Sequence, residues 1–182
     1  MYQIIDNFLD EKFYLELSEI IKSENIPWYF KAEDTQNSNN KNGYFCHNLY
    51  IDDQPDSAYY ISLMKPILKK LNYISCVEAR INLTTRDIDT VQSAFHVDHS
   101  FKNATTGILY LTNSNARTVL KIKGKEIFVK SKNNRLLLFD TEIQHKVIYH
   151  SDIHKRYVIN FTYIGDKNYG NRKITNTQAN RG

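Results

Sequence analysis

The sequence predicts a mostly β protein with flanking helices, a double-stranded β-helix (jelly roll) with N-terminal helices packed on one sheet. Two observations lead to this prediction. Helical periodicity occurs only before Leu71, and from Ser75 onward the chain is a succession of short segments of strand-like composition. Many short strands separated by turn signals and preceded by helices are typical of two packed sheets with helices on one outer face.

The first helix is predicted from its cap and its apolar spacing. After a strand candidate at Tyr2 to Ile5, Asp10 can cap a helix that ends near Ser23 to Asn25, before Pro27. The apolar residues of this segment fall on one helical face: Phe13, Leu17, Ile20 and Ile21.

A polar loop, a strand and a second helix are expected next. The segment Lys31 to Gly43 has almost no apolar residues and is predicted to be a long exposed loop, which we interpret as a candidate substrate lid. A strand is predicted at Phe45 to Ile51 and a helix from about Asp56 to Leu71. Pro66 is expected to kink or shorten that helix, because proline has no N–H to donate within a helix.

The rest of the chain is predicted to be strands. The candidates are Cys76 to Thr84, Thr106 to Thr112, Thr118 to Ile122, Glu126 to Val129, Arg135 to Phe139, Lys146 to Tyr149 and Arg156 to Ile164. Lys123-Gly124-Lys125 predicts a tight hairpin between two of them, and Lys132-Asn133-Asn134 predicts a turn.

Length and charge favour one domain without a nucleic-acid face. A chain of 182 residues with 41% apolar residues suits one core, so we expect a jelly-roll domain at 1–165 and a flexible basic tail at 166–182. The formal charge is +4, of which the tail carries +3. A body near neutrality makes nucleic acid an unfavoured partner, and the sequence leaves the oligomeric state open.

Compartment is inferred from cysteines and from the N-terminal segment. Cys46 and Cys76 have neither the spacing nor the density of a disulfide framework. Acidic residues interrupt the first ten positions, where a signal peptide would have a positive start and an apolar run. No segment is long enough to span a bilayer, so we expect a cytoplasmic protein with two reduced thiols and no membrane partner.

Two histidines and one aspartate form the candidate metal site. In an extended segment residues i and i+2 point the same way, so His96 and Asp98 can reach one metal while Val97 points elsewhere. His145 follows the apolar strand that ends at Phe139 and can arrive from a distant strand. Two imidazoles and one carboxylate are the ligand set of a non-haem Fe(II) centre with three open positions.

Other histidines weaken this inference when the motif stands alone. An HxD triplet is more often incidental than metal-binding, and His47, His150 and His154 have no evident purpose. His99 has the opposite strand parity to Asp98 and is the less favoured ligand. The combination of the triplet with His145 and with Arg156 in matching order is what makes a metal site the stronger interpretation.

Arg156 is the candidate co-substrate anchor. It shares one strand face with Val158, Asn160 and Thr162, a mixed face that suits the lining of a cavity although a solvent face suits it too. Its planar guanidinium makes two parallel hydrogen bonds to a carboxylate and stays charged at any working pH. A fixed cation beside an open iron site is what a dicarboxylate such as 2-oxoglutarate requires.

At this point the chain resembles the Fe(II)- and 2-oxoglutarate-dependent dioxygenases, in particular the prolyl-4-hydroxylase-like branch and its small phage-type members. The likeness covers nearly the whole chain. It rests on the following segments: Tyr2 to Asp10, Ala79 to Leu83, Phe95 to Asp98, Gly107 to Asn113, Asn134 to Asp140 and Arg156 to Phe161.

The resemblance implies a set of site residues and a reaction. His96, Asp98 and His145 carry over as the iron ligands and Arg156 as the anchor of the distal carboxylate, while Tyr110 and Thr118 match positions that line the co-substrate pocket. The implied cofactors are Fe(II), 2-oxoglutarate and O2, with ascorbate as a reductant. The implied reaction hydroxylates a small-molecule or peptide substrate, a peptidyl proline being one candidate, and releases succinate and CO2.

Two departures and several alternatives stay open. Thr84 stands where many members have a tyrosine, and Val158 stands where many have a serine two residues after the cation. The alternatives are a non-catalytic jelly-roll module that binds a metal or ligand, a cupin-type metalloenzyme, and a nucleic-acid-directed oxidative demethylase of the same superfamily. No acid follows His99 before Glu126, which disfavours the cupin ligand pattern. The presence of Asp98 argues against a halogenase variant.

Overall fold

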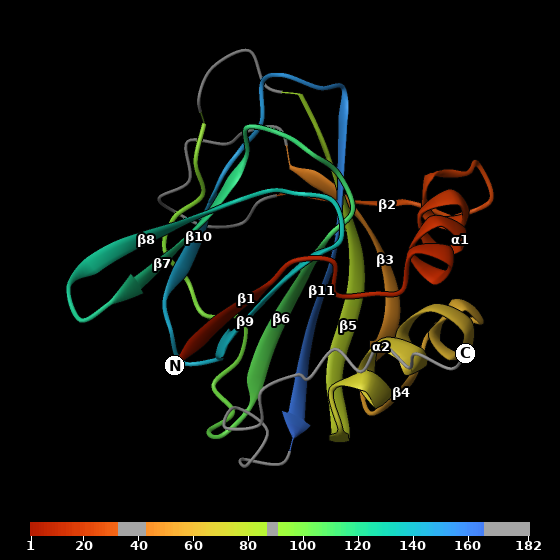
Figure 1. Cartoon of the computed structure of the whole chain (residues 1–182), viewed down its shortest axis with the longest axis horizontal. Helices are drawn as coiled ribbons and strands as arrows, with labels where there is room; N and C mark the ends of the chain where they lie inside the picture. The colour runs from red at the N-terminus through yellow and green to blue at the C-terminus, as the bar shows by residue number, and fades with distance from the viewer. Residues whose placement is uncertain (33–42, 87–90, 166–182) are drawn as a thin grey trace, which may run out of the picture.

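A computed structural model of the chain describes residues 1–32, 43–86 and 91–165. Two antiparallel sheets pack against each other, and the helices lie on the outer side of the larger sheet (Figure 1). The predicted class, a jelly roll with N-terminal helices packed on one sheet, is confirmed.

The N-terminal elements form as their sequence predicts. β1 (Tyr2–Ile5) pairs with the larger sheet and is followed by α1 (Glu11–Lys22). Asp10 caps the helix, because its side chain accepts two backbone N–H groups of the first turn. Ser23 ends it, since both its N–H and its hydroxyl donate to the carbonyl of Ile20.

The second helix is shorter than predicted, and its expected start at Asp56 is wrong. A π-helical turn, η1 (Tyr60–Met64), leads directly into α2 (Lys65–Lys70). Pro66 lies in the first turn of α2, where the missing N–H costs little. The residues before the helix instead form β4 (Gln54–Pro55), which pairs back onto the preceding strand.

The larger sheet has eight strands in the order β1-β9-β6-β11-β5-β3-β2, with β4 paired to β3. Its remaining strands are β2 (Tyr29–Lys31), β3 (Tyr44–Ile51), β5 (Tyr73–Thr85), β6 (Thr105–Tyr110), β9 (Arg135–Asp140) and β11 (Lys155–Gly165). The long antiparallel pair β5 and β11 forms its centre, from Lys155 opposite Thr85 to Gly165 opposite Tyr73.

The smaller sheet has the order β10-β7-β8. Its strands are β7 (Arg117–Ile122), β8 (Lys125–Lys130) and β10 (His145–Ile148). Lys123 and Gly124 both have positive φ, +49° and +76°, as a two-residue hairpin turn requires, so the predicted hairpin is confirmed. All seven strands predicted after Ser75 are present, with bounds shifted by at most three residues.

Alternation along β11 divides its side chains between two apolar clusters. Tyr157, Ile159 and Phe161 pack toward the helices, whereas Val158 belongs to the cluster between the two sheets. Gly107 lies against the Phe161 ring, where a Cβ atom would come within 2.3 Å of a ring carbon. The face of β11 that bears Arg156 therefore points between the sheets.

Several predictions concern residues that the structure does not describe. The candidate lid lies for the most part within 33–42, and the predicted tail is 166–182, so both remain predictions. Cys46 and Cys76 are free and buried, in agreement with the expected reduced thiols. No helix in the described part of the chain is both long and apolar enough to cross a lipid bilayer.

Candidate metal centre and adjacent cavity

The two predicted histidine ligands are brought together by their own backbone. His96 and His145 form an antiparallel bridge in which each N–H donates to the other residue's carbonyl, both at 2.9 Å. Directly opposed residues of an antiparallel pair project on the same side. The two imidazole rings accordingly lie with their centroids 4.5 Å apart.

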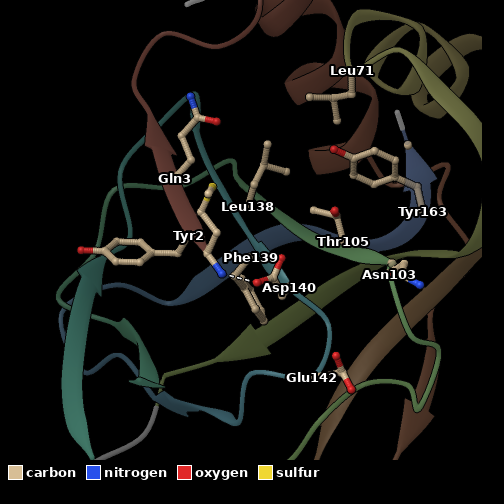
Figure 2. Close-up of a pocket in the computed structure, with 13 residues that line it drawn as sticks. Tyr2, Gln3, Leu71, Asn103, Thr105, Leu138, Phe139, Asp140, Glu142 and Tyr163 are labelled. Atoms are coloured by element: carbon tan, nitrogen blue, oxygen red, sulfur yellow. Dashed lines mark hydrogen bonds and ion pairs between the residues drawn. The ribbon is translucent and has the colours of Figure 1, made fainter. Parts of the chain in front are cut away.

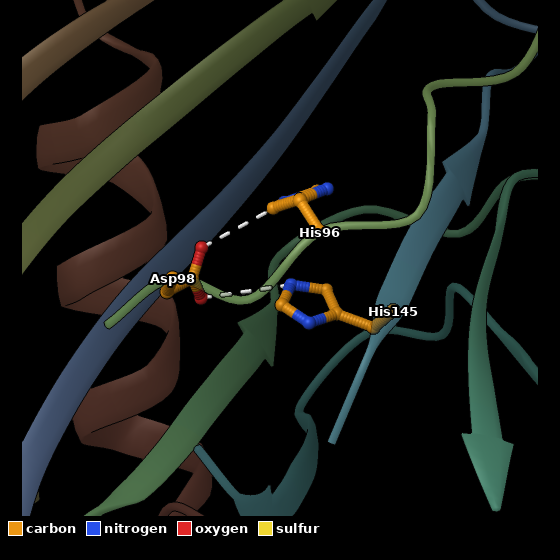
Figure 3. Close-up of side chains that lie close together, drawn as sticks. All are labelled: His96, Asp98 and His145. Atoms are coloured by element: carbon orange, nitrogen blue, oxygen red, sulfur yellow. Dashed lines mark ion pairs between the residues drawn. The ribbon is translucent and has the colours of Figure 1, made fainter. Parts of the chain in front are cut away.

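Asp98 completes the predicted group of three. Its Oδ1 atom lies 3.8 Å from Nε2 of His96, and its Oδ2 atom lies 3.6 Å from Nε2 of His145 (Figure 3). One donor atom from each residue lies within 4.8 Å of the other two. Among the described residues this is the one cluster of three such side chains that is placed to share a metal ion.

Backbone carbonyls fix which nitrogen of each ring is free. Nδ1 of His96 lies 3.1 Å from the carbonyl of Ala94, and Nδ1 of His145 lies 3.4 Å from the carbonyl of Ile143. A carbonyl only accepts hydrogen bonds, so each Nδ1 is the donor and each Nε2 carries the lone pair. Such partners on the remote nitrogen are typical of metal-binding histidines.

The pKa shifts of His145 and Asp98 favour the deprotonated forms that bind metal ions. Burial lowers the pKa of His145, although the neighbouring Asp98 acts in the opposite direction, so the ring is neutral. Burial alone would raise the pKa of Asp98, but His145, Arg80 and His96 outweigh it and lower that pKa. Metal ligands must be deprotonated to bind, and both groups are. The donor set of two imidazoles and one carboxylate therefore fits Fe(II).

A cavity of about 470 Å³ lies between the sheets beside the three residues. Its floor consists of cross-strand pairs on the inner face of β5 and β11: Thr84 opposite Arg156, Asn82 opposite Val158, and Arg80 opposite Asn160. From the smaller sheet come Thr118, His145 and Val147. The alternation of Arg156, Val158 and Asn160 thus marks a cavity wall and not a solvent face.

Arg156 is buried in this cavity wall, with 3% of its surface exposed. Its Nε donates to the hydroxyl of Ser131 at 3.3 Å, and its guanidinium lies 5.6 Å from the ring centroid of Tyr110. Burial lowers its pKa from the ordinary value of 12.5. No acidic side chain of the described residues forms an ion pair with it. A buried cation without a counter-ion is costly, and an anionic ligand would remove that cost.

The two other predicted pocket residues occupy different layers. Thr118 lines the cavity, whereas Tyr110 is fully buried behind the wall. The Tyr110 hydroxyl donates to Oγ1 of Thr118 at 2.7 Å, and burial raises its pKa to about 12. Tyr110 therefore supports both Thr118 and the guanidinium of Arg156, and it reaches the cavity only through them.

The two departures from the family pattern are visible here. Thr84 stands opposite Arg156, and its hydroxyl is buried without a hydrogen-bond partner among the described residues, as is Oδ1 of Asn82 on the same strand face. Val158 lines the cavity with an apolar side chain. Unpaired buried polar atoms beside a cavity are typical of a site that a polar ligand completes.

Sequence reasoning missed part of the site. Arg80 and Tyr44 line the cavity and were not among the predicted site residues. His99, the histidine that the sequence disfavours as a ligand, lies outside the group of three, and its Nε2 pairs with Glu78 at 2.6 Å. A signal for Arg80 exists in the sequence, since polar Glu78, Arg80, Asn82 and Thr84 alternate with apolar side chains along β5. That alternation predicts a polar inner face, but not what it contacts.

A second cavity, of about 450 Å³, lies at the other end of the larger sheet (Figure 2). It is bordered by β1 and β9, and the amino group of Met1 pairs there with Asp140. None of the six predicted site residues lines it. The chemistry described above is therefore confined to the cavity that contains Arg156.

Comparison with solved structures identifies the fold. The chain is similar to a prolyl-4-hydroxylase of Pseudomonas putida, with a TM-score of 0.62, 15% identity, and 91% of this chain and 92% of the other covered. It is similar to a prolyl hydroxylase of Trichoplax adhaerens in complex with a peptide fragment of the hypoxia inducible factor oxygen degradation domain (TM-score 0.63, 17% identity, 94% and 87% covered). A 2OG-Fe(II) oxygenase family oxidoreductase of Burkholderia pseudomallei gives a TM-score of 0.68 at 9% identity, with 89% and 84% covered.

These likenesses define the class. The chain has the fold of the 2-oxoglutarate- and Fe(II)-dependent oxygenases in the form found in prolyl hydroxylases, so the resemblance predicted from the sequence is confirmed at the level of fold. No protein-family model matches the sequence. No curated protein matches it either. The likeness to small phage-type members stays a prediction.

Proposed function

We propose that this protein is an Fe(II)- and 2-oxoglutarate-dependent oxygenase that hydroxylates a peptide or small-molecule substrate. The observation that carries the proposal is the buried Arg156, unpaired with any acid of the described residues, in the same cavity as His96, Asp98 and His145. A dicarboxylate that reaches both features would satisfy the cation at one end and the metal at the other. The fold supports this interpretation independently.

Each residue has a role in this proposal. His96, Asp98 and His145 would hold Fe(II), and Arg156 would bind the distal carboxylate of 2-oxoglutarate through two parallel hydrogen bonds. Thr118, held by the Tyr110 hydroxyl, would help to fix the position of that carboxylate, and Val158 would present an apolar surface to the bound co-substrate. Bound iron supplies the chemistry by which O2 oxidises 2-oxoglutarate to succinate and CO2 and hydroxylates the substrate.

For the substrate we propose a class of molecule and not a particular compound. The Trichoplax protein is in complex with a peptide, and the Pseudomonas protein is also a prolyl hydroxylase, so a proline-containing peptide is the first substrate to test. A small molecule is the alternative within the same reaction type.

The test is succinate formation from 2-oxoglutarate with Fe(II) and ascorbate, in wild type, His96→Ala and Arg156→Ala. We expect wild type to form succinate, His96→Ala to form none, and Arg156→Ala to require far more 2-oxoglutarate. Binding of Fe(II) and 2-oxoglutarate without turnover on any panel of peptides or small molecules would support a non-catalytic binding module instead.

A further inference from the structure

Asp98 lies in a segment without regular secondary structure, unlike the strand residue His145. Residues 97–100 belong to no strand, so no backbone ladder fixes the direction of the Asp98 carboxylate. The side chain is nevertheless 94% buried, since only 6% of its surface is exposed. Its orientation must therefore come from side-chain contacts.

Two side chains of the larger sheet hold the two carboxylate oxygens. Nη2 of Arg80 lies 3.7 Å from Oδ1 of Asp98, and Nδ2 of Asn160 lies 3.4 Å from Oδ2. Arg80 on β5 and Asn160 on β11 are directly opposed in the strand register. Each carboxylate oxygen therefore lies near one side chain of the sheet and one histidine nitrogen: Oδ1 near Arg80 and His96, Oδ2 near Asn160 and His145.

Arg80 is itself held in place by Glu78. Nη1 of Arg80 lies 2.7 Å from Oε1 of Glu78, two residues earlier on the same strand face. The other oxygen, Oε2, lies 2.6 Å from Nε2 of His99, the residue that follows Asp98. Glu78 thus connects the strand to the loop at the position next to the metal ligand.

We propose that Arg80 and Asn160 are positioning residues that orient the carboxylate of Asp98 for metal binding, and that Glu78 fixes Arg80 in this role. The inference rests on the proposed metal site. Arg80 and Asn160 each contact a different carboxylate oxygen, and each of these oxygens also lies within 3.8 Å of a histidine Nε2 atom. The carboxylate then pays little conformational entropy when the metal binds, and partners of this kind contribute about 10- to 100-fold in metal affinity.

A merely structural role makes a different prediction. If Arg80 served only to neutralise Glu78, its loss would lower the thermal stability and leave the metal affinity of the folded protein unchanged. Asn160 separates the two cases more cleanly, because it is neutral and its removal leaves no buried charge without a partner. Lysine at position 80 keeps the charge but lacks the guanidinium fork that spans Glu78 and Asp98.

The experiment is an anaerobic calorimetric titration of Fe(II) into the full chain. The variants are Arg80→Gln, Arg80→Lys, Asn160→Ala and the control Arg117→Gln, which removes an exposed arginine of β7 outside the cavity. We expect about 10- to 100-fold weaker binding for Arg80→Gln and about tenfold for Asn160→Ala. Arg80→Lys should fall between Arg80→Gln and wild type, and the control should match wild type. The visible absorption of bound Co(II) reports the coordination of the metal. It should change in the variants of Arg80 and Asn160 and stay unchanged in the Arg117→Gln control.

The outcomes separate this inference from the proposed function. Failure of wild type to bind Fe(II) would remove the proposed function and this inference with it. Wild-type binding with unchanged affinity and unchanged Co(II) spectrum in folded Asn160→Ala and Arg80→Gln would overturn the positioning role alone. If Arg80→Gln does not fold, the result for Asn160→Ala decides.

Discussion

Replacing Arg156 with methionine is expected to stabilise the ligand-free protein and to weaken its binding of 2-oxoglutarate strongly. The two effects have one cause. The Arg156 guanidinium is buried, with 3% of the residue exposed, and no acidic side chain of the described residues pairs with it. Methionine has a similar length and no charge. It removes the cost of burying the guanidinium together with the group that binds the carboxylate.

The size of each effect follows from the contacts of Arg156. Replacing buried ionic groups with apolar side chains of similar volume is often stabilising by about 1–4 kcal/mol. Against this stand the lost hydrogen bond to Ser131 and the lost contact with the Tyr110 ring, each about 1 kcal/mol. At the middle of that range the net gain is about 0.5 kcal/mol, which raises Tm by about 1–2 °C in a protein of this length. Loss of two charge-assisted hydrogen bonds costs about 3 kcal/mol of 2-oxoglutarate affinity, on the order of a hundredfold in Kd.

Thermal unfolding with and without ligand measures both effects. Mn(II) is used in place of Fe(II) to avoid turnover, and Arg117→Met is the control for removal of an exposed arginine. Ligand at about 100 times its Kd stabilises the wild type by about 2.7 kcal/mol. The order of stability should therefore reverse, with the variant more stable alone and the wild type more stable with Mn(II) and 2-oxoglutarate. A variant that is less stable without ligand, or that keeps the ligand-induced shift, would refute the reasoning.

Two further predictions concern stability away from the cavity. Hydrogen bonds from Arg135 hold the pKa of Asp6 far below its ordinary value of 3.8, so this carboxylate stabilises the fold above that pH and loses its contribution as pH falls through the lowered pKa; the Tm difference between wild type and Asp6→Asn should shrink on acidification, and a widening difference would contradict the assignment. Gly107→Ala would place a Cβ atom 2.3 Å from the Phe161 ring and should cost about 1–3 kcal/mol in urea unfolding; wild-type stability of Gly107→Ala would show that the ring moves freely.

The strands were predictable where one face carries apolar side chains and the other carries polar ones. β11 alternates in hydrophobicity because it separates the helix-facing core from the cavity, and its strand was predicted within one residue at each end. β2 (Tyr29–Lys31) was missed because all three of its residues are exposed, so no alternation arises. β4 has only two residues and exists through its pairing with β3, which no local pattern encodes.

The helix error has a local physical reason. Asp56 to Leu71 has apolar residues at helical spacing, yet the helix begins only at Tyr60, after a backbone bond from its N–H to the carbonyl of Ser57. The N–H of Asp56 instead donates to the carbonyl of Leu49 on β3, so Asp56 continues the strand pairing and does not start the helix. Pro66 lies at the junction between the π-helical turn and α2.

The cluster of His96, Asp98 and His145 was predictable because ligand chemistry and strand parity restrict the candidates, and the three side chains do lie close together; that they hold a metal stays a prediction. In an extended segment His96 and Asp98 would share one side, and His145 follows a recognisable strand. The contacts of Arg80 were not predictable, because they depend on the register that places Arg80 opposite Asn160. Register is a property of the assembled sheet, and a shift of β5 by one residue would turn the Arg80 side chain to the helix side, away from Asn160.

The most direct test of the proposed function is the affinity of 2-oxoglutarate with and without a divalent metal. Calorimetric titration into wild type, His145→Ala and Arg156→Met, each with and without Mn(II), measures whether one molecule contacts both ends of the cavity. We predict that Mn(II) tightens 2-oxoglutarate binding in wild type, that His145→Ala loses this enhancement, and that Arg156→Met binds weakly in both conditions. Equal affinity with and without Mn(II) in wild type, or no binding in either, would contradict the assignment of this cavity to an iron and 2-oxoglutarate site.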